Sequence, residues 1–543
     1  MTRKLWPSFA ALILAVAMLT GCGKTKTEPT ISTLPLNNMA FDLADASGIE
    51  VHAFELADGE VRTWNARPVV APLAGIIALP EAQRPHPLVI IVHGARRIDS
   101  IRDKVYAGFE YLVRQLAAEG YAAMSVNVNV EYTEEFGESL GGSWAYSIFG
   151  QHLALLERAN AGEDAGHGID LTGRLDLDQI HVMGHSRGGE LADIFVRNDQ
   201  AVGLGRIRSI LRVASSVLSY DEPEDAPHPD IPTGIILPEF DGDLVTPFGQ
   251  QVFDEILMEA RNRSFASVVY LRGANHNFFN RAVENDDRTS GFGEVAQTAK
   301  ETWLTREEQE DFLMRYAAAF LAIATGARGP WGTFNPLEPQ PVTMFGYAAM
   351  ASTYLPGVRR ILTSGTGTAA GVATAERYVQ RGLIEGLFNH PSVINRRDEQ
   401  LRLTALTWNG EDGAAAFTPT ENDFSGAEAI SLYVAVDSSN ELNSQGENQA
   451  FTIALIDSAG ARRSVIIPAG TSALAWHPGK VHHYEGWGDI PGVEAWLGFM
   501  PLGELRIPLG LFDGINLGMV ASIEIVFDQT ASGAMMLEGM YLG

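Results

Sequence analysis

The sequence predicts an α/β fold over residues 45–328 and an all-β fold over residues 396–543. In the first region, apolar runs alternate with stretches that carry apolar residues at helical spacing, which is typical of a mainly parallel sheet with helices on both faces. In the second region, short strand-like runs are separated only by turn residues, which favours two packed sheets. Residues 329–395 begin with a segment rich in Pro and Gly, and we expect them to form a linker with one short helix near 372–387.

Each element of the α/β region follows from a residue pattern. Leu88–Val92 is a continuous apolar run, as expected for a strand buried on both faces. Val105–Glu119 carries apolar residues at helical spacing. Thr305 and Glu308 form a capping box that predicts the start of another helix. The remaining elements that we expect are strands at 122–128, 180–183, 210–214, 234–238 and 267–271, and helices at 145–160 and 187–197.

The all-β region shows six strand-like runs. They read LRLTALTW, AISLYVAV, AFTIALID, RRSVIIP, ASIEIVFD and GAMMLEGMYL. The pattern resembles the jelly-roll modules that follow many bacterial hydrolase domains, and this resemblance implies carbohydrate as a possible partner of the region.

The composition excludes several classes of protein. The chain has 543 residues, 46% of them hydrophobic and 20% charged, which is a globular composition. Asp and Glu number 67 against 39 Lys and Arg, a net charge of −28, which excludes phosphate-driven binding of nucleic acid and general attraction to anionic lipid. A single cysteine excludes intrachain disulfides, cysteine-based zinc sites and iron–sulfur clusters.

Residues 1–21 have the pattern of a signal peptide, with a basic start and the apolar run FAALILAVAML. Small residues precede Cys22, which resembles the lipobox of bacterial lipoproteins and implies a lipid on that cysteine. The alternative is an ordinary apolar anchor with an incidental cysteine, although eleven helical residues rise only about 16 Å. We expect residues 22–44 to be a tether and the protein to be lipid-anchored at the cell envelope. Because Gly23 follows the cysteine, the outer membrane is the expected address in a Gram-negative cell.

The strongest chemical signal is the segment Gly184-His185-Ser186-Arg187-Gly188-Gly189. It fits the pattern G-x-S-x-G between a predicted strand and a predicted helix, which is the context of a nucleophile elbow. Side chains at 184 or 188 would collide with the backbone of the tight turn. The alternative is a serine that only caps a helix.

Two further candidate residues follow later strands. Asp243 lies in an acidic turn and precedes Leu-Val-Thr-Pro, while Asp241 lies two residues earlier in the same turn. His276 follows the next predicted strand. A serine nucleophile needs a base, and this base needs an orienting acid. The turn pattern favours Asp243 as the acid; Asp241 stays open, and the unused carboxylate would cap backbone amides.

Together these motifs resemble the α/β-hydrolase superfamily, and most closely its dienelactone-hydrolase and polyester-hydrolase esterases. The resemblance implies that Ser186 is the nucleophile, His276 the general base and acid, and Asp243 the orienting acid. The turn after Leu88–Val92 would provide the backbone N–H of Ala95 to an oxyanion hole, together with that of Arg187. The chain lacks the cysteine pairs of many polyester hydrolases, and the segment between the strand at 210–214 and Asp243 is too short for a large lid domain.

The expected activity is therefore that of a serine carboxylic-ester hydrolase acting on a small-molecule or polymeric ester, without cofactor or metal. The alternatives are a serine peptidase of the prolyl-oligopeptidase type and a non-catalytic polysaccharide-binding lipoprotein. Three weaker signals are the aromatic residues of segment 129–147, a Ca²⁺ site at the acidic residues of segment 284–287, and sugar stacking or metal binding by segment 476–487 with His482 and His483. The patterns favour ordinary packing or solvated loops for the last two.

Overall fold

The computed structural model describes residues 31–543 except 64, 134–141, 217–227, 245–247, 259–262, 364–366, 380–400, 411–412, 484–493 and 498–501. The expected signal peptide and the expected lipidation site Cys22 lie outside the described residues. Within the described residues, no helix has both the length and the apolar character needed to cross a membrane.

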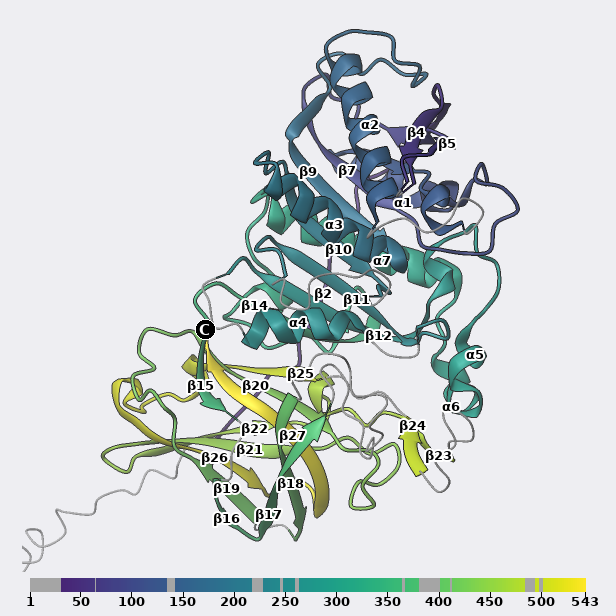
Figure 1. The fold of residues 1–543 in the computed structure, drawn as a ribbon. Helices are drawn as coiled ribbons and strands as arrows, with labels where there is room; N and C mark the ends of the chain where they lie inside the picture. The colour runs from purple at the N-terminus through teal and green to yellow at the C-terminus, as the bar shows by residue number, and fades with distance from the viewer. Residues whose placement is uncertain are drawn as a thin grey trace, which may run out of the picture.

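An eleven-stranded mixed sheet forms the centre of the first region (Figure 1). Its six middle strands are parallel: β8 (Ala122–Val126), β7 (His86–Val92), β9 (Leu175–His185), β10 (Ile207–Val213), β11 (Thr233–Phe240) and β12 (Ala266–Asn275). One edge continues through β6 (Ala74–Ala78) and β3 (His52–Glu55), and the other through β14 (Tyr347–Tyr354), β13 (Thr343–Met344) and β2 (Asn38–Met39). A small hairpin, β4 (Gly59–Arg62) and β5 (Pro68–Ala71), forms a separate two-stranded sheet. All six strands predicted for this region are present.

Helices cover both faces of the sheet. The alternating side chains of β7 show which helices lie on which face. Val89 and Ile91 pack in one core cluster with α1 (Glu110–Ala118) and α7 (Arg306–Ala324). Leu88 and Ile90 pack in another cluster with α2 (Ser143–Asn160) and α3 (Arg187–Ala201). Successive side chains of a strand point to opposite faces, so the continuous apolar run of β7 is explained by burial on both sides. The α/β prediction is confirmed at the level of a mixed sheet between two helical layers.

The predicted helix boundaries are largely confirmed. The helix expected at 105–119 begins with a 3₁₀ turn, Val105–Phe109, that leads into α1. The capping box of α7 forms as predicted, because the Thr305 hydroxyl accepts from the Glu308 N–H and the Glu308 carboxylate accepts from the Thr305 N–H. Three further helices lie in the second half of the region: α4 (Phe248–Met258), α5 (Arg288–Phe292) and α6 (Glu294–Thr298).

The C-terminal region consists of two sheets around one shared hydrophobic cluster. One sheet has the order β1 (Ile31–Thr33), β22 (Arg462–Ile467), β21 (Phe451–Asp457), β26 (Val520–Phe527), β19 (Gly413–Phe417) and β16 (Thr368–Ala370). The other has the order β17 (Val372–Val379), β18 (Leu401–Asn409), β27 (Ser532–Leu542), β20 (Ala429–Val436) and β25 (Gly503–Pro508), with β15 (Arg359–Thr363) also on β27. A separate hairpin joins β23 (Lys480–His483) and β24 (Glu494–Leu497). The six predicted strands are present, and the jelly-roll assignment stays a prediction.

Two expectations about the connecting segments are wrong. The helix expected near 372–387 is strand β17 over Val372–Val379, and residues 380–387 lie outside the described part of the chain. Segment 329–395 is therefore not a plain linker, because it provides β13 and β14 to the large sheet and three strands to the C-terminal region. The expected tether also ends earlier than residue 44, since β1 pairs with β22 and β2 pairs with β13.

Buried polar contacts join the two regions. Arg506 on β25 forms a buried ion pair with Glu504 at 2.9 Å and donates to the carbonyl oxygen of Thr333 at 3.0 Å. The Tyr433 hydroxyl on β20 donates to the carbonyl oxygen of Thr353 on β14 at 3.1 Å. Tyr433 and Tyr541 also belong to a hydrophobic cluster with β11, β12 and α4. The C-terminal region is thus packed into the body of the protein.

Candidate active site

Ser186 occupies a strained turn between β9 and α3. Its backbone has φ 56° and ψ −131°, and it is one of only four described non-glycine residues with positive φ. A side chain in this region of φ/ψ costs free energy, and such strain is concentrated at functional turns. The geometry is that of a nucleophile elbow, which lifts one serine above the carboxyl end of a parallel strand.

The glycines around Ser186 allow three segments to meet there. A Cβ on Gly184 would lie 2.1 Å from the carbonyl oxygen of Gly188, and a Cβ on Gly188 would lie 2.4 Å from the carbonyl oxygen of Val92. A Cβ on Gly94 would lie 2.5 Å from the Cβ of Ser186. The predicted collisions at 184 and 188 are therefore confirmed, and the turn after β7 lies directly against the serine.

His276 follows β12 and is paired with Asp241, which follows β11. The His276 Nδ1–H donates to Asp241 Oδ2 at 2.9 Å. Asp241 Oδ1 accepts the backbone N–H groups of Asp243 at 3.2 Å and Leu244 at 2.6 Å. The expectation that Asp243 provides this contact is corrected, because the tight turn holds Asp241 inward and leaves Asp243 on the outside. Asp241 was the alternative that the sequence left open.

Asp243 lies near the other nitrogen of the same ring. Its Oδ2 is 3.4 Å from His276 Nε2, and its side chain is 62% exposed whereas that of Asp241 is 8% exposed. In the described part of the chain, Ser186 Oγ makes no hydrogen bond. Asp243 is therefore the carboxylate that faces Nε2.

Charge around His276 favours its imidazolium form. Burial lowers the pKa of His276, but the charges of Asp241, Asp243 and Asp287 and the Asp241 hydrogen bond outweigh burial and raise the pKa to about 9. Burial raises the pKa of Asp241, and the attraction of His276 opposes that rise. An acid that stabilises the imidazolium is what a serine–histidine pair needs during proton transfer.

The neighbouring His185 links the serine turn to the histidine turn. Its Nε2–H donates to the carbonyl oxygen of His276 at 3.0 Å, and the two rings lie 4.8 Å apart. Burial lowers the pKa of His185 to about 3, so this ring is neutral and adds no charge beside His276. The sequence did not single out His185, because a histidine inside a G-x-S-x-G motif carries no pattern of its own.

The turn after β7 presents the expected oxyanion-hole segment. His93 Nδ1–H donates to the carbonyl oxygen of Gly94 at 2.9 Å, and His93 Nε2 accepts the Val128 N–H at 3.1 Å, so this ring holds the turn in place. The backbone N–H of Ala95 makes no hydrogen bond within the described residues. Arg187, the second expected donor, is the first residue of α3, where N–H groups point along the helix axis toward the turn.

The aromatic residues of segment 129–147 have different surroundings. The Tyr132 hydroxyl donates to the carbonyl oxygen of His93 at 2.8 Å, and the Arg187 guanidinium lies 5.4 Å from the Tyr132 ring. Trp144 is buried in the core and donates to the carbonyl oxygen of Arg62 at 2.8 Å. Phe136 lies outside the described residues. Tyr132 therefore borders the serine turn, whereas Trp144 belongs to the core.

The structure gives the acidic segment 284–287 hydrogen-bond and ion-pair partners within the protein. Asp286 pairs with Arg288 at 2.7 Å, and Asp287 accepts backbone N–H groups. His482 and His483 lie in strand β23. Within the described residues, no group of three or more His, Cys, Asp or Glu side chains is arranged to hold a metal ion.

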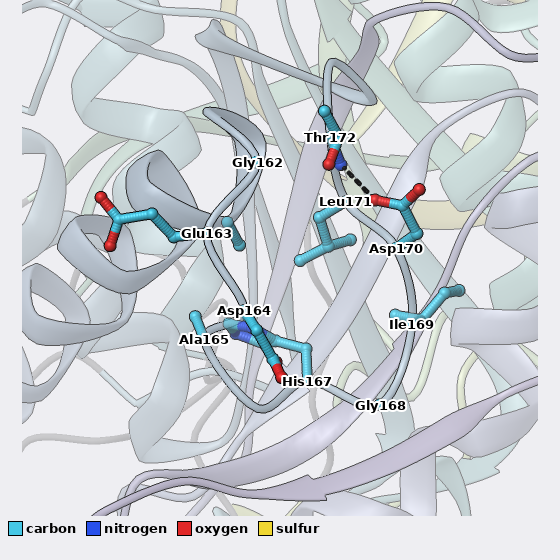
Figure 2. Close-up of a pocket in the computed structure, with 11 residues that line it drawn as sticks. Gly162, Glu163, Asp164, Ala165, His167, Gly168, Ile169, Asp170, Leu171 and Thr172 are labelled. Carbon is cyan, nitrogen blue, oxygen red and sulfur yellow. Dashed lines mark hydrogen bonds between the residues drawn. The ribbon is translucent and has the colours of Figure 1, made fainter.

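A cavity of about 410 Å³ lies far from Ser186, in the loop between α2 and β9 (Figure 2). Asp170 accepts the N–H of Thr172 at 3.0 Å, and Glu163 pairs with Arg158 at 2.7 Å. Both carboxylates therefore stabilise the loop itself, and Figure 2 shows them pointing apart. The loop precedes β9 and Ser186 follows it, so the whole length of this strand separates the cavity from the serine.

No protein-family model matches the sequence, and no curated protein matches it. Among solved structures, the crystal structure of a candidate dienelactone hydrolase from Klebsiella pneumoniae matches with 15% sequence identity over 47% of this chain and 98% of that chain, at a TM-score of 0.30.

Proposed function

We propose that the protein is a serine carboxylic-ester hydrolase, with Ser186 as nucleophile, His276 as general base and acid, and Asp241 as the orienting acid. The observation that carries the proposal is the strained Ser186 turn beside the Asp241–His276 pair, at the carboxyl ends of neighbouring strands. Ligands of open α/β sheets bind at these ends.

In the proposed reaction, Ser186 Oγ attacks the ester carbonyl carbon while His276 Nε2 takes the hydroxyl proton. The carbonyl oxygen becomes an oxyanion that the N–H groups of Ala95 and Arg187 would stabilise, and loss of one such donor typically raises the barrier by about 2.7–4 kcal/mol. The C–O bond then breaks, and the alcohol leaves with the proton from His276. Water repeats the sequence on the acyl-enzyme and releases the acid.

The test is hydrolysis of p-nitrophenyl esters of increasing acyl length by the mature protein and by Ser186→Ala. We expect turnover by the wild type and loss of turnover in the variant. A panel of peptide p-nitroanilides tests the peptidase alternative under the same conditions. Equal rates for wild type and Ser186→Ala would contradict the assignment of Ser186.

The anchoring at Cys22 is a separate proposal, supported by the N-terminal sequence alone. We expect labelled palmitate to be incorporated into the wild type in bacterial cells, and the Cys22→Ala variant to remain unlabelled. Labelling of both proteins would contradict it.

Carbohydrate binding by the C-terminal region is likewise a proposal, supported by its two-sheet pattern. The test is a pull-down of the whole mature chain on insoluble polysaccharides, because that region is packed against the large sheet. Failure on every polymer would remove the support for a glycan partner.

A further inference from the structure

The buried carboxylate of Asp287 connects the two turns that carry Asp241 and His276. Asp287 is 3% exposed. Its Oδ2 accepts the backbone N–H of Gly242 at 2.7 Å and that of His276 at 3.3 Å, and its Oδ1 accepts the N–H of Asn277 at 3.1 Å. One side chain thus holds the residue after the acid, the histidine itself and the residue after the histidine.

The loop that carries Asp287 is itself fixed by Arg288. The Arg288 guanidinium pairs with Asp286 at 2.7 Å and donates through Nε to the carbonyl oxygen of Gly273 at 3.1 Å. Asp286 also accepts the Asn275 side-chain amide at 3.1 Å. The Arg288 guanidinium lies 5.0 Å from the Phe278 ring. Asp287 therefore projects from a rigid support, which is a condition for precise positioning.

The turn of Asp241 approaches this loop as closely as glycine permits. A Cβ on Gly242 would lie 1.7 Å from the carbonyl oxygen of Asp287. Only a residue without a side chain allows its N–H to reach the Asp287 carboxylate at this point.

We propose that Asp287 is a positioning residue that keeps the Asp241 turn and the His276 turn in register by accepting backbone N–H groups from both. The inference rests on the function proposed above. It assigns a role to an acidic segment whose sequence had suggested a Ca²⁺ site or a solvated loop.

The charge of Asp287 also belongs to the surroundings of His276. Asp241 faces Nδ1 of His276, and Asp243 faces Nε2. Asp287 accepts the backbone N–H of His276, and the neutral His185 ring lies next to the His276 ring. Burial and the charge of Asp241 raise the pKa of Asp287, while the charge of His276 and the N–H donors lower it. The ionised form of Asp287 in turn raises the pKa of His276.

An asparagine at position 287 would separate a positioning role from simple filling of space. It keeps the shape of the side chain, but its NH₂ group faces an N–H donor where a carboxylate oxygen accepts, so at least one of the three contacts is lost. It also removes one negative charge from the surroundings of His276. We therefore expect both a slower reaction of Ser186 and a lower pKa of its base.

The experiment measures the rate of covalent labelling of Ser186 by a fluorophosphonate, from pH 5 to 10, in the full mature chain. Labelling forms the Oγ–P bond and expels fluoride, so it needs His276 as base but no knowledge of the ester. The variants are Asp287→Asn, the matched charge control Glu284→Gln on the exposed part of the same loop, and Gly242→Ala, which wedges the turns apart without a change of charge. Thermal unfolding is measured for each.

The labelling rate should rise with pH to a plateau, and the midpoint of this rise reports the pKa of His276. We expect Asp287→Asn to lower the plateau rate by about 10- to 100-fold, which is the scale expected for a small misplacement of catalytic groups. We also expect this variant to move the midpoint to lower pH. Gly242→Ala should lower the plateau alone, and Glu284→Gln should match the wild type. If Asp287→Asn folds and has the same plateau rate and midpoint as Glu284→Gln, the inference is overturned. If Asp287→Asn does not fold, Gly242→Ala decides, and an unchanged plateau rate in that variant overturns the inference. A wild type that is not labelled at any pH would overturn the proposed function and this inference together.

Discussion

Asp241 and His276 form a 2.9 Å hydrogen bond between the carboxyl ends of two adjacent parallel strands, β11 and β12. The turn after β11 gives Asp241 two backbone N–H donors and directs it toward Nδ1. Asp243, two residues later, faces Nε2 at 3.4 Å from the solvent side. The two carboxylates thus act on opposite nitrogens of one ring, and they should have different functions.

The first prediction compares Asp241→Asn with Asp243→Asn. Asp241→Asn should lower kcat by about 10³- to 10⁴-fold, because an asparagine in this place favours the wrong histidine tautomer. Asp243→Asn should change kcat by less than about tenfold, because an exposed charge is screened by solvent. The measurement is ester hydrolysis at saturating substrate. A larger loss in Asp243→Asn than in Asp241→Asn would restore Asp243 as the orienting acid.

The second prediction concerns pH. In the proposed mechanism His276 must be neutral to accept the serine proton, and its pKa is raised to about 9. The rate should therefore rise with pH through the alkaline range, rather than level off near the ordinary histidine pKa of 6.5. In Asp243→Asn, loss of a negative charge destabilises the imidazolium, so the pKa falls and the midpoint moves to lower pH. The kcat/KM profile of both proteins measures this, and a midpoint unchanged by the substitution would contradict the electrostatic account.

The third prediction concerns the strain stored at Ser186. Glycine accepts a backbone with φ 56° and ψ −131° more readily than alanine or serine. Ser186→Gly should therefore be more stable than Ser186→Ala by about 1 kcal/mol, although glycine normally destabilises through the entropy of the unfolded chain. Thermal unfolding of the two variants, compared at the same heating rate, tests it. A lower melting temperature for Ser186→Gly would mean that the turn is not strained.

Local signals predicted much of the fold and part of the site. The capping box of Thr305 and Glu308, the apolar run of β7 and the glycines around Ser186 each encode their structure within a few residues. The choice between Asp241 and Asp243 is different in kind. Both lie in one turn, and only the position of His276, directly after the next strand, decides which carboxylate meets Nδ1.

Non-local pairing explains the elements that the sequence did not predict. Residues 372–379 (VATAERYV) have a composition compatible with a helix, but they pair along their whole length with β18. Ile31–Thr33 is too short to be recognised, and it is a strand only because β22 lies beside it. Asp287 belongs to no sequence motif. Its proposed role follows from three backbone N–H donors whose separations from Asp287 along the sequence follow no pattern. Tertiary context overrides weak local preference in each case.

The last prediction follows from this pairing. The fragment 396–543 contains every strand that the sequence predicted for the C-terminal region, but it should not fold on its own. It lacks β1, β15, β16 and β17, which pair with β22, β27, β19 and β18. Without them, backbone groups on four strands lose their partners, and exposed strand edges favour aggregation.

The fragment would also expose Tyr433 and Tyr541, which are buried against β12 and α4 in the whole chain. We expect the fragment to unfold without a cooperative transition and to bind a hydrophobic dye, whereas the chain 31–543 unfolds cooperatively. Circular dichroism and dye fluorescence during heating distinguish the two. A fragment that melts cooperatively would show that the C-terminal region folds without the strands from 31–33 and 359–379.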